Sequence, residues 1–142
     1  MKRDSRLARM IHVLIHMGLL GGRETSETIA RMLNTNPVVV RRTMGALKRK
    51  GVVGSEGGRG GGWVLLRPLD ELTVLDVQKA LDGGTLLSAG LSEDHPACPV
   101  ERATNAALAQ AFERAELALL EVFTELKLST IAQYALETER RK

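Results

Sequence analysis

Apolar residues recur at helical spacing through the first 20 positions of the chain. Five of them fall on one helical face: Leu7, Met10, Ile11, Leu14 and Met17. This pattern predicts an amphipathic helix over about residues 5–20, with Ser5 placed to cap its start and Gly21-Gly22 placed to end it.

A second and a third helix are predicted after a short interval. Thr25 can cap the second helix, and three apolar positions would face inward: Ile29, Ala30 and Leu33. This helix should end near Asn34. The third helix has the clearest start signal, because Asn36 offers an oxygen to an unpaired backbone N–H and Pro37 suits the first helical position. The pattern is typical of a helix-turn-helix.

The two faces of the third helix differ in chemistry. One face is apolar and suits a core: Val40, Met44 and Leu47. The opposite face has cations and no apolar stripe: Val38, Arg42, Gly45 and Arg49, with Arg41 at its flank. A solvated face is the plain alternative, and Lys48-Arg49-Lys50 complement the helix dipole. However, the dipole disfavours cations at 41 and 42, so a functional role explains these two better.

A glycine-rich hairpin follows the third helix. Gly51 ends the helix, Val52-Val53 begin a strand, residues 57–62 form a turn, and residues 63–66 return as a second strand. A basic hairpin directly after an Arg-bearing helix indicates the wing of a winged helix-turn-helix, which binds DNA. The run GGRGGG also resembles a phosphate-binding loop. That alternative requires a following helix or a Gly-Lys-Ser/Thr ending, whereas here Trp63 continues a strand.

The C-terminal half is predicted to be helical. Residues 70–81 indicate a helix capped by Thr73, 82–97 a loop, 99–125 one long helix, and 129–138 a final helix. The long helix has an Ala-rich stripe and a second stripe of Leu and Phe. We expect one stripe to pack on its own domain and the Ala-rich one to allow close approach by a partner helix. The predicted domains are 1–82, a winged helix-turn-helix; 83–97, a loop; and 98–142, the dimerisation helix and C-terminal segment.

Charge is distributed unevenly along the 142 residues. Residues 1–67 carry 13 Lys/Arg against 4 Asp/Glu, whereas residues 68–142 carry 7 against 13. A basic half favours a polyanionic partner. The sole cysteine, Cys98, excludes an intrachain disulfide and indicates a reducing compartment. The first apolar segment is too short to cross a bilayer, so we predict a cytoplasmic protein with no membrane partner.

These elements together resemble the Rrf-two family of bacterial winged-helix transcriptional regulators, which includes iron–sulfur-cluster, nitric-oxide and cysteine-metabolism repressors. The resemblance covers nearly the whole chain and rests on segments in a fixed order: SRLA, TSETIA, TNPVVVRRTMGALKRKGVV, GGGW, LTVLDVQKAL, HPACPVERA and FTELKLSTI. It implies a mainly α fold with a small β-hairpin wing and a long C-terminal dimerisation helix. It also implies a homodimeric repressor that binds a pseudo-palindromic operator in double-stranded DNA.

The predicted DNA-binding residues come from the helix-turn-helix, the start of the first helix and the wing. They are Ser5, Thr25, Ser26, Asn36, Pro37, Val38, Arg41, Arg42, Arg49, Arg59 and Gly60. The family usually opens its wing with an Arg, where this chain has Gly57. Arg59 is therefore expected to contact phosphate rather than the minor groove. Cluster-binding relatives also carry three cysteines before the dimerisation helix, and one thiolate cannot hold a cluster, so no cofactor and no metal is predicted.

Other functions remain open at this stage. Cys98 precedes the long helix, where the dipole favours a thiolate, so a redox or electrophile sensor is the main alternative. The others are a thiol enzyme using Cys98 and His95, a winged helix that binds protein, and a metal site at His12 and His16. The thiol enzyme lacks a group to orient His95, the protein-binding module has no use for the basic half, and the His pair lacks further ligands. We predict that the chain is not an enzyme.

Overall fold

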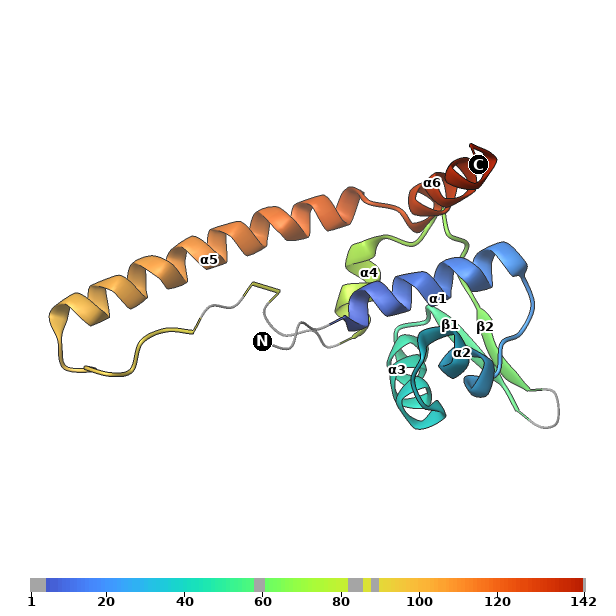
Figure 1. The fold of residues 1–142 in the computed structure, drawn as a ribbon, viewed down its shortest axis with the longest axis horizontal. Helices are drawn as coiled ribbons and strands as arrows, with labels where there is room; N and C mark the ends of the chain where they lie inside the picture. Colours follow the sequence, from blue (N-terminus) through green and yellow to red (C-terminus); the bar gives the residue numbers. More distant parts are fainter. Residues whose placement is uncertain (1–4, 58–60, 82–85, 88–89, 142) are drawn as a thin grey trace.

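The computed structural model describes residues 5–57, 61–81, 86–87 and 90–141. The elements within these ranges confirm a mainly α protein with one hairpin (Figure 1): α1 (Arg6–Leu20), α2 (Ser26–Leu33), α3 (Pro37–Arg49), β1 (Val53–Glu56), β2 (Gly62–Leu65), α4 (Val74–Ala80), α5 (Pro99–Glu125) and α6 (Leu128–Arg140).

Helix α1 lies at the centre of the body and contacts α2, β2, α4 and α6. Three residues of the predicted stripe are buried, Met10, Leu14 and Met17, and Leu7 and Ile11 are half-buried. Val13 and Ile15, which lie outside that stripe, are buried as well. The buried residues of α2 and α3 complete this side of the core: Ile29, Ala30, Leu33, Val40, Met44 and Leu47. The helical periodicity therefore identified the inward faces of α2 and α3 and part of the inward face of α1. Ser5 precedes α1 as expected, but its side chain makes no capping hydrogen bond.

The hairpin is a two-stranded antiparallel sheet. Val53 pairs with Leu65 and Glu56 with Gly62, one position earlier on the returning strand than the sequence indicated. Gly51 lies between α3 and the hairpin with φ of 73°, a left-handed conformation that glycine adopts without a side-chain clash.

Helix α4 is shorter than predicted. The sequence indicated a helix over residues 70–81, whereas α4 begins at Val74 after a capping box formed by Thr73 and Asp76. The preceding residues are held in another conformation, because Leu72 and Val74 exchange backbone hydrogen bonds with the link between α5 and α6. The Leu128 N–H donates to the Leu72 carbonyl (2.9 Å), and the Val74 N–H donates to the Leu126 carbonyl (2.9 Å).

Helix α6 returns to the body and packs on α1. Leu128 and Ala132 belong to the same buried cluster as the α1 side chains. This helix runs slightly beyond the predicted 129–138 at both ends. The C-terminal helix therefore contributes to the core that supports α2 and α3.

Helix α5 extends away from the body, and none of its residues is buried in the single chain (Figure 1). The loop before α5 was predicted to lack helices and strands, and its described part contains none. This part runs alongside α5 and is hydrogen-bonded to it by side chains. Asn105 makes two hydrogen bonds with the Ser92 backbone, and Glu116 accepts from the Leu86 N–H. Within the described ranges, no helix is both long and apolar enough to cross a membrane.

Candidate DNA-binding interface

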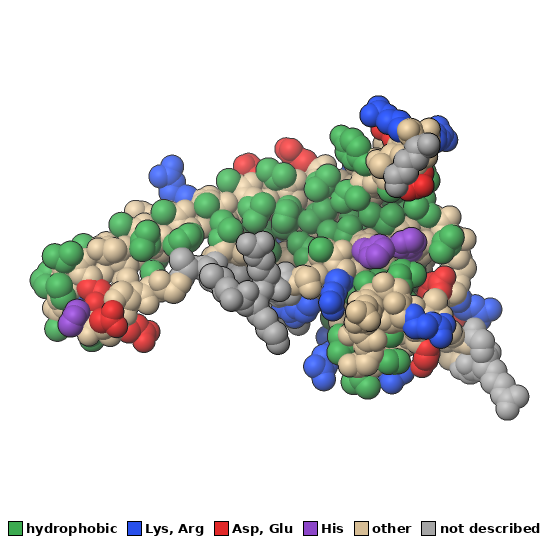
Figure 2. Space-filling model, in the orientation of Figure 1, with side chains coloured by type: hydrophobic (Ala, Val, Ile, Leu, Met, Phe, Trp, Pro, Cys, Tyr) green, Lys and Arg blue, Asp and Glu red, His purple; other side chains and the backbone are tan. Residues whose placement is uncertain are grey.

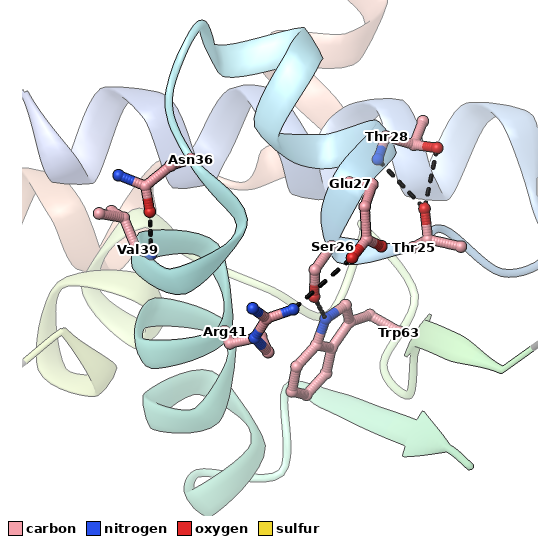
Figure 3. Close-up of polar contacts among 8 residues, drawn as sticks. All are labelled: Thr25, Ser26, Glu27, Thr28, Asn36, Val39, Arg41 and Trp63. Carbon is pink, nitrogen blue, oxygen red and sulfur yellow. Dashed lines mark hydrogen bonds and ion pairs between the residues drawn. The ribbon is translucent and has the colours of Figure 1, made fainter. Parts of the chain in front are cut away.

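Local hydrogen bonds cap the starts of both α2 and α3 (Figure 3). Thr25 Oγ1 accepts from the Thr28 N–H at 3.1 Å, and Asn36 Oδ1 accepts from the Val39 N–H at 3.0 Å. These caps satisfy backbone donors that the first turn of a helix leaves unpaired. Asn34 ends α2 with φ of 53°, a left-handed conformation that Asn tolerates better than most residues. The start of α3 is thus fixed by short-range hydrogen bonds.

The side of α3 that faces away from the core is exposed and cationic. Arg41, Arg42 and Arg49 are all exposed, and Val38 is 58% exposed, whereas Val40, Met44 and Leu47 on the other side are buried. Gly45 leaves open space beside this surface, because an added Cβ would have only the Arg49 guanidinium within 4 Å. We call the exposed residues Val38, Arg41, Arg42 and Arg49, together with the half-buried Gly45, the α3 basic face. Its shape and charge suit a polyanion that approaches along the helix.

One cation of the α3 basic face has an acidic neighbour. The Arg41 guanidinium lies 3.6 Å from the Glu27 carboxylate in the first turn of α2 (Figure 3). Both side chains are more than half exposed. The ion pair therefore adds little to stability, but it orients Arg41 toward the start of α2.

The hairpin is fastened to the start of α2 through Trp63. The indole Nε1–H donates to Ser26 Oγ at 2.9 Å (Figure 3). The backbones of Trp63 and Glu24 also exchange two hydrogen bonds, of 2.8 and 3.0 Å. Gly62 permits this close approach, since a Cβ there would lie 2.8 Å from the Glu24 carbonyl oxygen. We call Glu24, Ser26, Gly62 and Trp63 the wing anchor.

Two further side-chain contacts brace the hairpin. Lys48 near the end of α3 donates to Ser55 Oγ of β1 at 2.7 Å, and Arg23 pairs with Glu56 at 2.8 Å. The wing is thus held to both α3 and the segment that precedes α2.

The first turn of α1 adjoins the same region. Arg6 and Arg9 line a small hollow of about 30 Å³ together with residues of the α2–α3 turn and of α3, among them Thr35 and Thr43. The hollow brings the start of α1, which Ser5 precedes, close to the first half of α3.

Helix α5 presents its two apolar stripes to different surroundings. The Leu and Phe stripe is partly covered by its own chain, and Phe123 packs against the core. The Ala-rich stripe is exposed along its whole length: Val100, Ala103, Ala107, Ala111, Ala115, Ala118 and Val122. Hydrophobic side chains are accordingly visible on the surface of α5 (Figure 2). Intrachain packing therefore covers part of one stripe, which the sequence pattern predicted to pack on its own domain, and leaves the other uncovered.

Comparison with known proteins decides the classification of this fold. A family model described as Rrf2, an iron-dependent transcriptional regulator, matches residues 3–134. The chain belongs to the Rrf2 family. A helix-turn-helix transcriptional regulator of Bacillus subtilis (strain 168), YwnA, is 35% identical over 116 residues, which are 82% of this chain and 86% of YwnA. The chain is accordingly a DNA-binding transcriptional regulator, and the predicted Rrf-two resemblance is confirmed.

Solved structures share this fold. A crystal structure described as a DNA-binding protein is 30% identical, with a TM-score of 0.70, and the match covers 89% of this chain and 98% of that one. The global cysteine regulator CymR of B. subtilis shares the fold at 23% identity, with a TM-score of 0.67 and coverage of 94% and 98%. T. potens IscR shares the fold at 18% identity, with a TM-score of 0.69 and coverage of 97% and 90%.

The iron named in the Rrf2 description does not fit the side chains of this member. The chain has one cysteine, and a cluster needs about four ligands. No group of three or more His, Cys, Asp or Glu in the described ranges could hold a metal ion. His12 and His16 lie with ring centroids 4.8 Å apart on α1, so they form a pair without a third ligand among the described residues.

The structure brings most of the predicted interface residues together. Thr25 caps the start of α2, Asn36 and Pro37 begin α3, and the α3 basic face runs along α3, whereas Arg59 and Gly60 lie outside the described ranges. Ser26 differs from the rest, because it is only 9% exposed and its hydroxyl accepts from Trp63. Sequence reasoning missed Glu27, Lys48 and Trp63 as interface-shaping residues. The one signal for Trp63 was a lone Trp beside a glycine run.

Cys98 occupies the N-cap position of α5 and is half-buried. It lines an open hollow of about 310 Å³ with residues of the preceding loop and the first turns of α5: Ser92, His95, Val100, Glu101, Thr104 and Asn105. Glu101 accepts from the His95 backbone N–H at 2.7 Å, which holds the loop next to the thiol.

Proposed function

We propose that this Rrf2 protein acts as a homodimeric repressor that reads a pseudo-palindromic operator through the α3 basic face. The observation that carries this proposal is the exposure of Arg41, Arg42 and Arg49 on a helix whose opposite side is buried. In a helix-turn-helix of this kind, the second helix enters the major groove and the caps and flanking cations contact phosphates. Repression follows if the occupied operator overlaps a promoter.

Salt dependence tests the mode of binding. Three or four phosphates neutralised by each subunit would make about six to eight contacts per dimer. Operator affinity should then fall roughly a thousandfold or more between 50 and 200 mM salt. Fluorescence anisotropy with a labelled duplex measures this directly. Binding that ignores salt would contradict a phosphate-dominated interface.

The proposed dimer is supported by the uncovered Ala-rich stripe of α5. A helix that buries no residue in its own chain and exposes a continuous stripe of small apolar side chains suits close packing against a second copy. Two copies of α3 related by the dimer axis would then face half-sites whose centres are about one helical turn apart. In vitro transcription from a promoter that carries the operator tests repression, and stimulated transcription would contradict it.

A thiol sensor at Cys98 is the second candidate. The half-buried thiol stands at the junction of the fastened loop and α5, so its oxidation or alkylation would alter the start of the proposed dimer helix. Operator affinity should be measured with and without peroxide or an electrophile, in wild type and in Cys98→Ser. The sensor requires loss of affinity in wild type alone. Equal loss in both proteins, or in neither, would identify Cys98 as a packing residue.

A further inference from the structure

The wing anchor contains a polar contact that core packing does not require. Trp63 is half-buried, and its one polar atom donates inward to Ser26 rather than outward to water. Ser26 in turn is only 9% exposed and lies in the first turn of α2. A phenyl ring would also supply apolar packing but has no donor, so the indole N–H adds a directional contact that packing alone does not require.

The backbone of Trp63 also binds the segment before α2. Glu24 and Trp63 form an isolated antiparallel bridge, which extends the pairing of β2 beyond β1. The approach is so close that Gly62 has no room for a side chain on this side. The backbone bridge and the indole hydrogen bond therefore both hold β2 against the segment that begins α2.

Contacts also connect the wing anchor to the α3 basic face. Ser26 is followed directly by Glu27, which pairs with Arg41 of α3. Trp63 itself pairs with Ser55 of β1. The Ser55 hydroxyl in turn accepts a hydrogen bond from Lys48 of α3. The hairpin, α2 and α3 thus form a closed set of contacts around Ser26 and Trp63.

We propose that Ser26 and Trp63 are positioning residues that set the wing in register with the α3 basic face, so that both contact the same stretch of DNA. This inference rests on the proposed DNA interface and gives Ser26 a different role from the direct contact that its sequence position suggested. The wing segment, residues 53–66, carries one cation, Arg59. Loss of the anchor should therefore remove one phosphate contact per subunit while leaving α3 able to bind.

The test compares Trp63→Phe, Ser26→Ala and the double variant by operator affinity over a range of salt concentrations. One net hydrogen bond corresponds to roughly a two- to tenfold loss of affinity for each single variant. The slope of log affinity against log salt should become shallower, by up to about 0.9 per subunit if the wing contact is lost completely. The double variant should be no worse than either single one, because the same bond is lost once. Arg59→Ala should change the slope of wild type but not that of Trp63→Phe.

Matched controls separate positioning from a general loss of stability. Ser129→Ala makes the same change in α6, and its affinity and slope should equal those of wild type. Gly62→Ala should weaken binding through its clash with Glu24, whereas Gly57→Ala in the same hairpin has nothing within 4 Å of the added Cβ and should bind normally. Thermal unfolding of each variant establishes that the folded protein is being compared, and the Gly pair decides the matter if Ser26→Ala does not fold.

Two results would overturn the inference. One is an unchanged salt slope in Trp63→Phe and Gly62→Ala, and the other is additive losses in the Ser26 and Trp63 double variant. If these occur while wild type binds with a steep salt dependence and Arg42→Ala weakens it, the proposed interface stands and the anchor role fails. A wild type that binds no duplex DNA contradicts both.

Discussion

Arg41 and Glu27 face each other across the α2–α3 pair, with the guanidinium 3.6 Å from the carboxylate. The two side chains come from different helices, and both are more than half exposed. A carboxylate in this position competes with DNA phosphate for the same cation. An exposed pair of this kind adds little to stability, so its effect in the proposed interface would be on how readily Arg41 binds DNA.

We expect Glu27→Gln to raise affinity for non-specific duplex DNA severalfold, because Arg41 is released and a negative charge is removed from the interface. Affinity for the operator should rise less, so the ratio of operator affinity to non-specific affinity should fall. Glu71→Gln removes the same charge near α6 and should change neither affinity. Anisotropy with operator and scrambled duplexes measures the ratio. A Glu27→Gln protein that binds DNA more weakly would show instead that the carboxylate holds Arg41 in its binding orientation.

Arg42→Ala tests base readout by the α3 basic face. If the guanidinium reaches a guanine edge, its removal should cost about 1–3 kcal/mol and relax preference at one half-site position. Arg59→Ala should lower affinity for every sequence alike, as expected of a phosphate contact. Competition among operators substituted at single positions distinguishes the two effects. An equal loss of affinity for all substituted operators would show that Arg42 contacts phosphate rather than a base.

Asn36 tests the capping of α3. Asn36→Ala should lower the free energy of unfolding by about 1 kcal/mol, because the Val39 N–H loses its acceptor. Asn36→Asp should keep most of that stability, since Asp caps helix starts as well as Asn does. Urea unfolding followed by circular dichroism measures both. Equal destabilisation by Ala and Asp would show that Asn36 stabilises the turn through its amide nitrogen rather than through the cap.

Ala115→Glu tests the proposed dimer. Ala115 is exposed in the single chain, so the change should leave the fold intact and act only at a partner contact. A charge buried without a partner in a close-packed seam should dissociate the dimer and abolish specific binding together. Ala109→Glu places the same charge on the opposite side of α5 and should remain dimeric. Sedimentation at micromolar concentration measures both, and a monomeric wild type would contradict the dimer outright.

The accuracy of sequence reasoning followed the range of the interactions involved. Asn36 and Pro37 predicted the start of α3 correctly because a cap depends on residues three positions apart. The start of α4 was placed too early because Leu72 and Val74 pair with residues more than fifty positions later, and this pairing overrides local helical preference. Ser26 and Trp63 are 37 positions apart, and no local pattern links them. The apolar residues of α1, α2, α3 and α5 recur at helical spacing, so the sequence could predict the faces of these helices.

Selection of bound sequences from a randomised duplex pool tests the central claim most directly. Wild type and an Arg41→Ala/Arg42→Ala double variant would be compared at near-physiological salt. The proposed interface predicts that wild type enriches a pseudo-palindrome whose half-site centres lie about one helical turn apart, and that the double variant enriches no defined motif. Enrichment of the same motif by both proteins, or of a single asymmetric site by wild type, would contradict recognition by a dimer through the α3 basic face.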